Sequence, residues 1–358
     1  MHIAYYISDY GYGHASRSVA IIRRLLKDYH HIKVTVCHSF AFDFLKQSLQ
    51  DPRVSFRNVK TDIGYIIDAN TLEIDRVQLK TELAAQQMNW PMMTHLENLF
   101  LQDQMVELVL SDISALGIEA AKQTGINSIG ISNFLWTDVY QSLVTKSTYT
   151  HLSEAYEKMS YYISLEGNIK TISNQSEPDI PFFSRDIDWN EVEHIRTELV
   201  KDNKILVFYG LGMKINHDLL VHQLKLFQSE DCTFIVSSHV NYESENVYRI
   251  PNDYLETQHF VAASDLVITK PGWSTVSEAI QGESRLLLLK RESFLEDATT
   301  IRLLKERNEC QTLSFSQLNR LVLNNESISF FHKEIQLREK SNGLDCLMNR
   351  LDKFLVSD

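Results

Sequence analysis

The fold is decided by residues 265–282, which read D-L-V-I-T-K-P-G-W-S-T-V-S-E-A-I-Q-G. Residues 266–269 are a short apolar run typical of a buried parallel strand, and Pro271-Gly272 after it predicts a sharp turn. Apolar residues at helical spacing follow, with Ser274 or Thr275 as the expected N-cap and Gly282 at the expected end of the helix. Because a helix N-terminus presents unpaired N–H groups and about half a positive charge, this order predicts a phosphate site. Any strand-to-helix turn of an α/β protein shares these features, so the rest of the chain must decide.

Length, charge and cysteine usage limit the class of protein. At 358 residues the chain exceeds an ordinary single core, which predicts two domains. A net charge of -12 without a Lys/Arg cluster argues against a nucleic-acid partner. The apolar runs are strand-sized, so we expect no transmembrane segment. Four scattered cysteines and an N-terminus without a signal-peptide pattern favour a cytoplasmic protein with reduced thiols.

Both halves of the chain open with a strand, a glycine loop and a helix. In the first half these are residues 3–7, 8–14 and 15–27; in the second they are residues 204–209, Gly210-Leu211-Gly212 and about 216–227. This repetition predicts an α/β protein of two doubly wound, Rossmann-like domains that face each other across a cleft. A nicotinamide or flavin cofactor is not expected, because Ser16 replaces the third glycine of the dinucleotide fingerprint.

The expected domain limits follow from these patterns. The first domain covers residues 1–166, and within it residues 61–101 predict one or two helices interrupted by Pro91. Residues 167–188 are polar, contain Pro178 and Pro181, and form the expected linker. The second domain covers residues 189–342, and the amphipathic segment 343–358 is expected to pack back on the first domain.

Two candidate catalytic residues follow strands of the first domain. His14 stands where a helix begins, and its near-neutral pKa suits a general base. Asp112 follows the strand predicted at residues 106–110, so it reaches the same sheet edge. Asp112 could orient His14, as a carboxylate does in hydrolase triads, or it could cap the helix predicted at residues 115–123. His14 could equally bond only to its own loop.

Asp186-Ile187-Asp188 matches the D-x-D metal motif of one class of sugar transferases. No strand leads into it, and Asp188 looks like the start of a helix. We therefore predict no metal site.

Three motifs together resemble the GT-B glycosyltransferases. The stretch I-S-D-Y-G-Y-G-H-A-S-R-S at residues 7–18 resembles their acceptor-side loop, and residues 111–126 resemble their middle strand-to-helix segment. Residues 265–282, with R-E-S-F-L-E-D at 291–297, resemble their donor site. The nearest pattern is that of family 28, the MurG-like enzymes. The resemblance covers both domains in the right order and implies a UDP-sugar-dependent hexosyltransferase.

The resemblance also implies residue roles. Ser274 and Thr275 would hold the diphosphate, and Glu278 would bind the ribose, although Thr275-x-x-Glu278 could instead be a capping box. Ile250 would contact uracil through its backbone, and Glu296-Asp297 replace the pair that contacts the donor sugar. The implied donor-binding residues are Gly210, Gly212, Ile250, Gly272, Ser274, Thr275, Glu278, Glu296 and Asp297. The implied acceptor-side residues are Gly13, Arg17 and Asn133, beside the catalytic pair His14 and Asp112. Met213-Lys214 departs from the small hydroxyl residues usual after Gly212.

The implied reaction is metal-independent inverting transfer of a sugar from a UDP-sugar to the hydroxyl of a small-molecule or glycan acceptor, without a cofactor. Two other functions share the motif. The nucleotide-sugar hydrolase of pseudaminic acid synthesis has a similar G-x-G-H-x-x-R loop, here residues 11–17. The N-terminal half of plant L-arabinokinases carries a similar G-x-G-H-A-x-R stretch, which would fit a non-catalytic nucleotide-sugar-binding protein.

Overall fold

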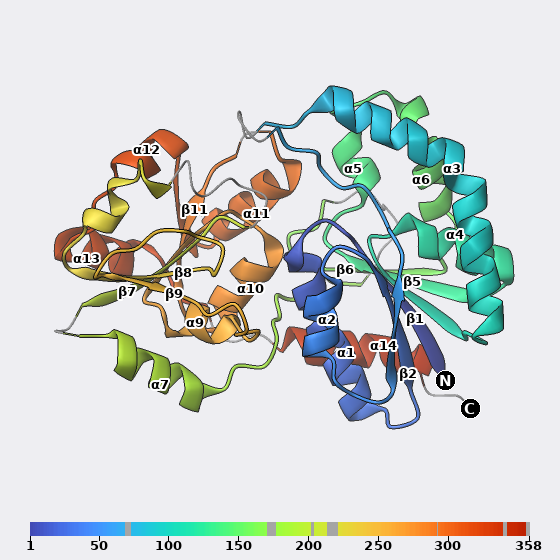
Figure 1. Ribbon diagram of the computed structural model, residues 1–358, viewed down its shortest axis with the longest axis horizontal. Coiled ribbons are helices and arrows are strands. Elements are labelled where there is room, and N and C mark those ends of the chain that lie inside the picture. Colours follow the sequence, from blue (N-terminus) through green and yellow to red (C-terminus); the bar gives the residue numbers. More distant parts are fainter. Residues whose placement is uncertain are drawn as a thin grey trace. The chain divides into compact units, whose positions relative to one another are not determined.

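The computed structural model describes residues 1–68, 73–169, 177–201, 204–212, 221–291, 293–338 and 342–355. The chain forms two compact units (Figure 1). Unit 1 consists of Met1–Pro181 and Asn342–Asp358, and unit 2 of Phe182–Ser341. Each unit contains a six-stranded, all-parallel sheet with flanking helices, which agrees with the predicted α/β class and doubly wound architecture.

Unit 1 has the strand order β3-β2-β1-β4-β5-β6. Its strands are β1 (His2–Ile7), β2 (Lys33–His38), β3 (Val54–Asn58), β4 (Leu108–Asp112), β5 (Asn127–Ser132) and β6 (Tyr161–Ser164). Its helices are α1 (Tyr12–Asp28), α2 (Phe42–Ser48), α3 (Arg76–Asp103), α4 (Ala115–Thr124), α5 (Trp136–Tyr140), α6 (Thr150–Tyr156) and α14 (Gly343–Leu355), with a 3-10 turn η1 (Lys146–Thr148). The strand order reverses between β1 and β4, and ligands of open α/β sheets bind beyond the carboxyl ends of strands at such a point.

Unit 2 repeats this plan with the order β12-β11-β10-β7-β8-β9. Its strands are β7 (Ile205–Gly210), β8 (Cys232–Val236), β9 (Val247–Arg249), β10 (Leu266–Thr269), β11 (Arg285–Leu289) and β12 (Cys310–Leu313). Its helices are α7 (Trp189–Leu199), α9 (Gln258–Ala263), α10 (Trp273–Gln281), α11 (Leu295–Glu306), α12 (Phe315–Arg320) and α13 (Asn325–Glu334), with a 3-10 turn η2 (Lys225–Gln228). Here the order reverses between β7 and β10, which makes the turns after these two strands the expected ligand site.

The core of each unit follows from the apolar strands that the sequence predicts. All residues of β4 and of β10 are buried, as expected for parallel strands covered on both faces. In unit 2 the buried cluster joins β7, β8 and β10 to residues of α12 and α13, including Leu318 and Ile328.

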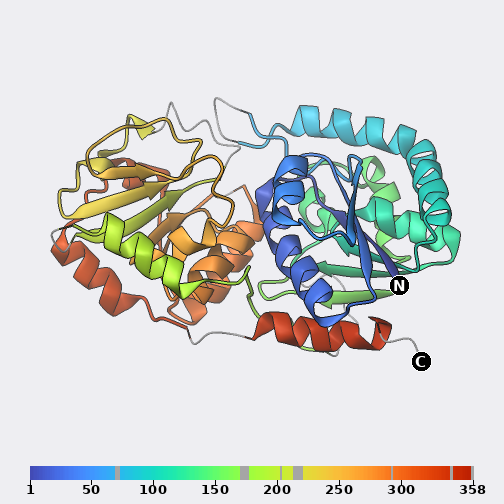
Figure 2. The ribbon, with the colours of Figure 1, turned by 60° about the horizontal axis from the view of Figure 1, so that its bottom comes forward.

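The C-terminal helix α14 belongs to unit 1, where it lies beside α1 (Figures 1 and 2). Arg24 forms an ion pair with Asp345 at 2.5 Å, and the Tyr29 hydroxyl donates to Asp352 at 2.8 Å. Leu347 and Leu351 on the opposite face of the helix are fully buried.

The predicted break at Pro91 is wrong. Helix α3 is a single helix of 28 residues with Pro91 inside it. A proline in a helix interior removes one backbone hydrogen bond without necessarily ending the helix. The Thr94 hydroxyl bonds the Trp90 and Pro91 carbonyls in the next turn. Buried Leu83, Trp90 and Leu101 anchor the helix on both sides of the proline, so packing overrides the local signal.

The ends of two predicted helices also differ from the structure. The N-cap of α10 is Gly272, not Ser274 or Thr275, because the helix already begins at Trp273. Gly282 ends α10 with φ −83°, so it is not the left-handed C-terminal glycine expected. Its lack of a side chain serves close packing instead, since a Cβ there would lie 2.6 Å from the Ala262 Cα.

Two further predictions fall partly outside the described residues. The helix predicted at about 216–227 starts among residues 213–220, outside the described residues. The described part begins with a helical residue, Val221, and continues through a turn to η2. The predicted linker 167–188 includes residues 170–176, also outside the description, whereas residues 182–188 are part of unit 2.

Candidate active site

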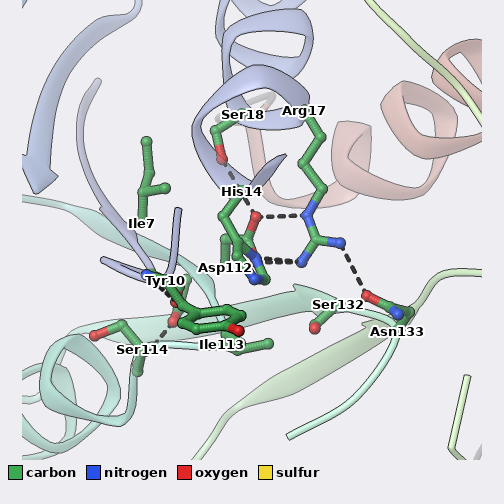
Figure 3. A network of polar contacts seen from close by, with 12 residues as sticks. Ile7, Tyr10, His14, Arg17, Ser18, Asp112, Ile113, Ser114, Ser132 and Asn133 are labelled. Atoms are coloured by element: carbon green, nitrogen blue, oxygen red, sulfur yellow. Dashed lines mark hydrogen bonds and ion pairs between the residues drawn. The ribbon is translucent and has the colours of Figure 1, made fainter. Parts of the chain in front are cut away.

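The first group of predicted site residues lies where the sheet of unit 1 reverses. His14 is the third residue of α1, directly after the loop that leaves β1, and Asp112 is the last residue of β4. Because β1 and β4 are neighbours, with Ile7 opposite Asp112, these residues meet at one sheet edge. The His14 Nδ1 lies 3.0 Å from the Asp112 Oδ1, and both side chains are buried (Figure 3).

Asp112 does not cap α4. The N-cap of that helix is Ser114, and the carboxylate instead receives Arg17 in a two-pronged contact, Nε to Oδ2 at 2.6 Å and Nη2 to Oδ1 (Figure 3). Arg17 also donates from Nη1 to the Asn133 Oδ1 at 2.9 Å. His14, Asp112, Arg17 and Asn133 were all predicted site residues. That Arg17 joins Asp112 to Asn133 could be recognised only from the structure, because it depends on which strands are neighbours.

The charges of the network set the protonation of His14. Burial would raise the pKa of Asp112, but Arg17 and His14 lower it to about 2, so the carboxylate is ionised at neutral pH. Burial, the largest influence, and the nearby Arg17 lower the pKa of His14 below 6.5, against the opposing effect of Asp112. The imidazole is therefore neutral at pH 7.

The tautomer of His14 follows from its neighbours. Nδ1 lies 3.0 Å from the Asp112 Oδ1 and 2.9 Å from the Arg17 Nη2, and it cannot donate to one and accept from the other at once. Arg17 already donates both Nε and Nη2 to the carboxylate, so a proton on Nδ1 directed to Asp112 gives the better-satisfied arrangement. In that tautomer Nε2 keeps its lone pair and can accept a proton.

Asp9 and Asp62 form a second buried group in unit 1, which sequence reasoning missed. Asp9 accepts from the backbone of Ser39, Phe40 and Thr61 at 2.8–3.0 Å, and so holds the loops after β2 and β3. Asp62 accepts from the Asp9 N–H at 3.1 Å and from the Trp136 Nε1 at 2.9 Å. Burial and the charge of Asp9 raise the pKa of Asp62 to about 7. Each aspartate follows a predicted strand, which is the signal that could have found them.

The second group of predicted residues lies where the sheet of unit 2 reverses. Gly210 ends β7 opposite Thr269 of β10, and the Thr269 hydroxyl donates to the Gly210 carbonyl at 2.7 Å. Gly212 has φ +84°, a conformation that glycine alone adopts without strain. The N-cap of α10, Gly272, has no side chain to bond the first N–H groups of the helix, where Ser274 and Thr275 lie.

Lys270 is a basic residue of this group that sequence reasoning did not single out. A Cβ on Gly212 would lie 3.0 Å from the Lys270 Cε and 3.2 Å from its Nζ, and a Cβ on Gly272 would lie 3.4 Å from Cε. The end of the lysine side chain thus lies against both glycine turns. Lys270 could have been recognised from the sequence, because it stands directly after a predicted buried strand in the stretch T-K-P-G.

Glu278 does not form the alternative capping box. Its Oε1 accepts from the Arg185 Nη2 at 3.1 Å, and both side chains are buried. Ile250 is buried, and its N–H already donates to the Val236 carbonyl at 2.9 Å, so a base contact through this N–H is not open.

The predicted sugar-contacting pair lies in the first turn of α11 and not on a loop. Asp297 is completely buried, and its two oxygens accept from Arg291 at 2.6 and 2.7 Å. Asp297 thereby stabilises the start of α11, and a contact with a donor sugar would require Arg291 to leave. Glu296 is half-buried in the same turn. Asp188, from the D-x-D stretch, is the N-cap of α7 and accepts from the Asn190 N–H at 2.9 Å.

Metal-binding clusters and membrane spans are both lacking in the part of the chain that the structure describes. No group of three or more His, Cys, Asp or Glu side chains there is arranged to hold a metal ion. No helix there is both long and apolar enough to cross a bilayer.

Solved structures identify the class of fold. The glycosyltransferase SnogD from Streptomyces nogalater aligns over 99% of both chains with a TM-score of 0.61 and 12% identity. UGT89C1 of Arabidopsis thaliana, solved with UDP, aligns over 99% of this chain and 100% of its own, with a TM-score of 0.60 and 14% identity. The two-domain fold of this chain is the GT-B fold of these glycosyltransferases, as the sequence predicted.

Sequence relatives add two more specific likenesses. An L-arabinokinase of Arabidopsis thaliana is 27% identical over 306 residues, which are 82% of this chain but only 28% of that protein. An uncharacterized glycosyltransferase of Methanosarcina acetivorans is 22% identical over 378 residues, covering 98% of this chain and 95% of its own. No protein-family model matches the chain.

Proposed function

We propose that this protein is a glycosyltransferase of the inverting, metal-independent kind, which moves a sugar from a UDP-sugar to an acceptor hydroxyl. The observation that carries the proposal is what lies at the two points of strand-order reversal. The first holds a neutral buried imidazole in contact with a carboxylate. The second holds two glycine turns, a helix whose N-cap is a glycine, and Lys270. The GT-B fold and the full-length likeness to an uncharacterized glycosyltransferase support the same reaction. The finer assignment to family 28 rests on the sequence motifs.

In this proposal unit 2 binds the donor. The diphosphate carries negative charge, and the first N–H groups of α10 with the ammonium group of Lys270 offer complementary positive charge. Gly212 and Gly272 let the diphosphate approach the backbone, since neither has a Cβ. Charge that develops on the departing UDP is stabilised by these groups, so the reaction needs neither a metal ion nor a cofactor.

His14 is the proposed base. The acceptor oxygen attacks the anomeric carbon while its proton passes to the His14 Nε2. The bond from that carbon to the diphosphate oxygen breaks, and UDP leaves with the bonding electrons. Asp112 stabilises the imidazolium that forms, through the contact at Nδ1. A single displacement of this kind inverts the anomeric centre.

The test has two stages. Thermal-shift titration with UDP, TDP, GDP and their sugars identifies the nucleotide, because a ligand that binds the folded state raises the melting temperature. Product analysis with the donor found in this way then compares the wild type with His14→Ala. We expect turnover to fall by about two to four orders of magnitude with little change in UDP affinity. His30→Ala, an exposed histidine of the same unit, is the matched control and should keep full turnover. Unchanged turnover in His14→Ala would refute the assignment of the base.

A second candidate function is nucleotide-sugar binding without transfer, and the likeness to L-arabinokinase favours it. Calorimetric binding of UDP with no turnover of any common UDP-sugar would support that candidate. Release of UDP and free sugar without an acceptor would instead support a hydrolase, with His14 activating water.

A further inference from the structure

Helix α3 of unit 1 carries a row of exposed apolar side chains. The helix packs on α4 and η1 and forms an outer rim of unit 1 in both views (Figures 1 and 2). On its solvent side, Met88, Met92, Leu96 and Leu99 are 77%, 60%, 50% and 50% exposed. Their spacing of three or four residues places them along one side of the helix, where they form an apolar stripe. Single apolar side chains are ordinary on a surface, whereas a contiguous row of them marks an interaction surface.

The apolar stripe also lacks the charges that the solvent side of a helix normally carries. Charged residues make up 23% of the chain, but Glu97 is the only Asp, Glu, Lys or Arg among residues 83–102. Glu97 is only 2% exposed, because its oxygens accept from the Arg57 Nη2 at 2.8 Å and from the Tyr6 hydroxyl at 2.8 Å. Water therefore meets an uncharged surface along about 30 Å of helix, at ~1.5 Å per residue.

A groove adjoins the apolar stripe. It has a volume of about 760 Å³ and lies between α3 and β3, the edge strand of the sheet. Leu96 and Leu99 line it from α3, and residues 55–58 line it from β3. The face is therefore hollowed, and side chains of a partner can enter it. Methionine is well suited to fill such a recess, because its side chain is unbranched and flexible.

The charge of the chain indicates which partner covers this face. A net charge of -12 makes two copies repel each other in most orientations, but a contact through the apolar stripe brings no carboxylates together. A basic partner would be attracted by acidic side chains, which the stripe does not contain. A membrane surface is disfavoured as well, since interfacial helices are rich in Lys and Arg beside their apolar face. Of these residues α3 has only Arg76 and Lys80, both near its N-terminal end.

We propose that the apolar stripe is a homodimer interface, in which the stripes of two copies pack antiparallel across a two-fold axis. In such a contact the same surface serves both copies. The centre of the stripe falls between Met92 and Leu96, so Met92 of one copy lies opposite Leu96 of the other. Asp103, which also lines the groove, is then opposite Ala85 and not opposite a carboxylate.

The size of the face sets the expected strength of the dimer. The solvent side of a helix about 30 Å long and ~11 Å wide presents roughly 600 Å² to water. Two copies would bury roughly 1,200 Å², which is the lower end of the range for specific interfaces, and the groove adds to this area. We therefore expect a reversible dimer with a Kd on the order of micromolar. This contact involves unit 1 alone and does not depend on the proposed reaction.

The test is analytical ultracentrifugation of the full chain at about 1 to 100 µM, a range that brackets this Kd. The mass of the wild type should rise with concentration from 41.5 kDa toward twice that value. Met92→Lys and Leu96→Glu should each raise the Kd at least about tenfold, because each places a charge in an uncharged contact. An equimolar mixture of the two variants should associate again, because the new lysine and the new glutamate then lie opposite each other.

Phe330→Lys is the matched control. Phe330 is a 54% exposed apolar residue on a helix of unit 2, so its replacement should leave the dimer unchanged. All three variants change exposed helical side chains to good helix formers, so each should melt within about 2 °C of the wild type.

Three results would overturn the proposed dimer. The first is a wild type that stays at 41.5 kDa over the whole range, and the second is stripe variants that associate as strongly as the wild type. The third comes from flotation with vesicles of phosphatidylcholine and phosphatidylglycerol. A wild type that floats while Leu96→Glu does not would show that the stripe binds a membrane surface instead. A mixture of Met92→Lys and Leu96→Glu that stays monomeric would contradict the two-fold arrangement.

Discussion

Replacing Asp112 by Asn tests the buried network of unit 1 most severely. The carboxylate receives Arg17 through Nε at 2.6 Å and through Nη2, and it also contacts His14 at 3.0 Å. Asparagine has nearly the same shape but no charge. The substitution therefore leaves the Arg17 guanidinium buried without its counter-ion. It also leaves one amide oxygen in place of two carboxylate oxygens to accept from Arg17 and His14, so the His14 tautomer is no longer fixed.

The magnitude follows from the burial of the pair, with Arg17 and Asp112 only 3% and 1% exposed. Breaking a buried ion pair by removing one partner costs about 3–5 kcal/mol. For a unit of about 200 residues, each kcal/mol lowers Tm by roughly 2–4 °C, so we expect a fall of about 6–20 °C. Turnover should fall by about 10⁴, the effect of the same substitution in a hydrolase triad.

Calorimetric unfolding and a donor-turnover assay measure the two effects. Ser18→Ala is the matched control, because the Ser18 hydroxyl lies 3.4 Å from the same carboxylate and its loss should cost no more than about 1 kcal/mol. An Asp112→Asn variant that melts within 2 °C of the wild type, or keeps more than about a tenth of its turnover, would refute this reasoning.

Three further predictions follow from other residues. The pKa of Asp62 is raised from 3.8 to about 7, so between these pH values the folded state holds a proton that the unfolded chain has lost. The stability that this group contributes is therefore fully present below about pH 4 and is lost as the pH rises through about 7. Asp62→Asn does not titrate, so its stability relative to the wild type, measured by urea unfolding, should rise by up to ~4 kcal/mol between pH 4 and 8; a constant difference would contradict this. Lys270→Met should weaken UDP binding at least about tenfold but leave uridine binding unchanged. If the affinities for UDP and for uridine fell by the same factor, Lys270 would not contact the phosphates. Gly212→Ala should lower the free energy of unfolding by about 1–2 kcal/mol, because alanine is strained at a φ of +84°. It should also weaken UDP binding, because the new Cβ would press against the Lys270 side chain. Unchanged stability and UDP affinity would argue against both effects.

The strands could be predicted because they are buried on both faces and read as short apolar runs. Residues 266–269, for example, coincide with β10. Helix ends were less predictable, because tertiary packing decides them. Gly272 is the N-cap of α10, although serine and threonine side chains such as those of Ser274 and Thr275 are preferred at N-caps. Pro91 lies within α3 because buried residues anchor the helix on both sides of it.

The candidate site was predictable where it depends on strand ends. His14 and Asp112 follow strands, and parallel strands bring their carboxyl ends to one edge. The partners of these residues were not predictable in the same way, because they depend on which strands are neighbours. Arg185, 93 residues before Glu278, carries no local pattern that relates the two, and the pairing of Arg291 with Asp297 depends on where α11 begins.

The central claim is that the first turn of α10 binds the diphosphate of a sugar nucleotide. A crystal structure of the chain with UDP tests this most directly. We expect the diphosphate oxygens to lie within hydrogen-bond distance of the Ser274 and Thr275 N–H groups, with the Lys270 ammonium beside them. UDP bound elsewhere, or a first turn of α10 that contacts only protein atoms in the complex, would contradict it.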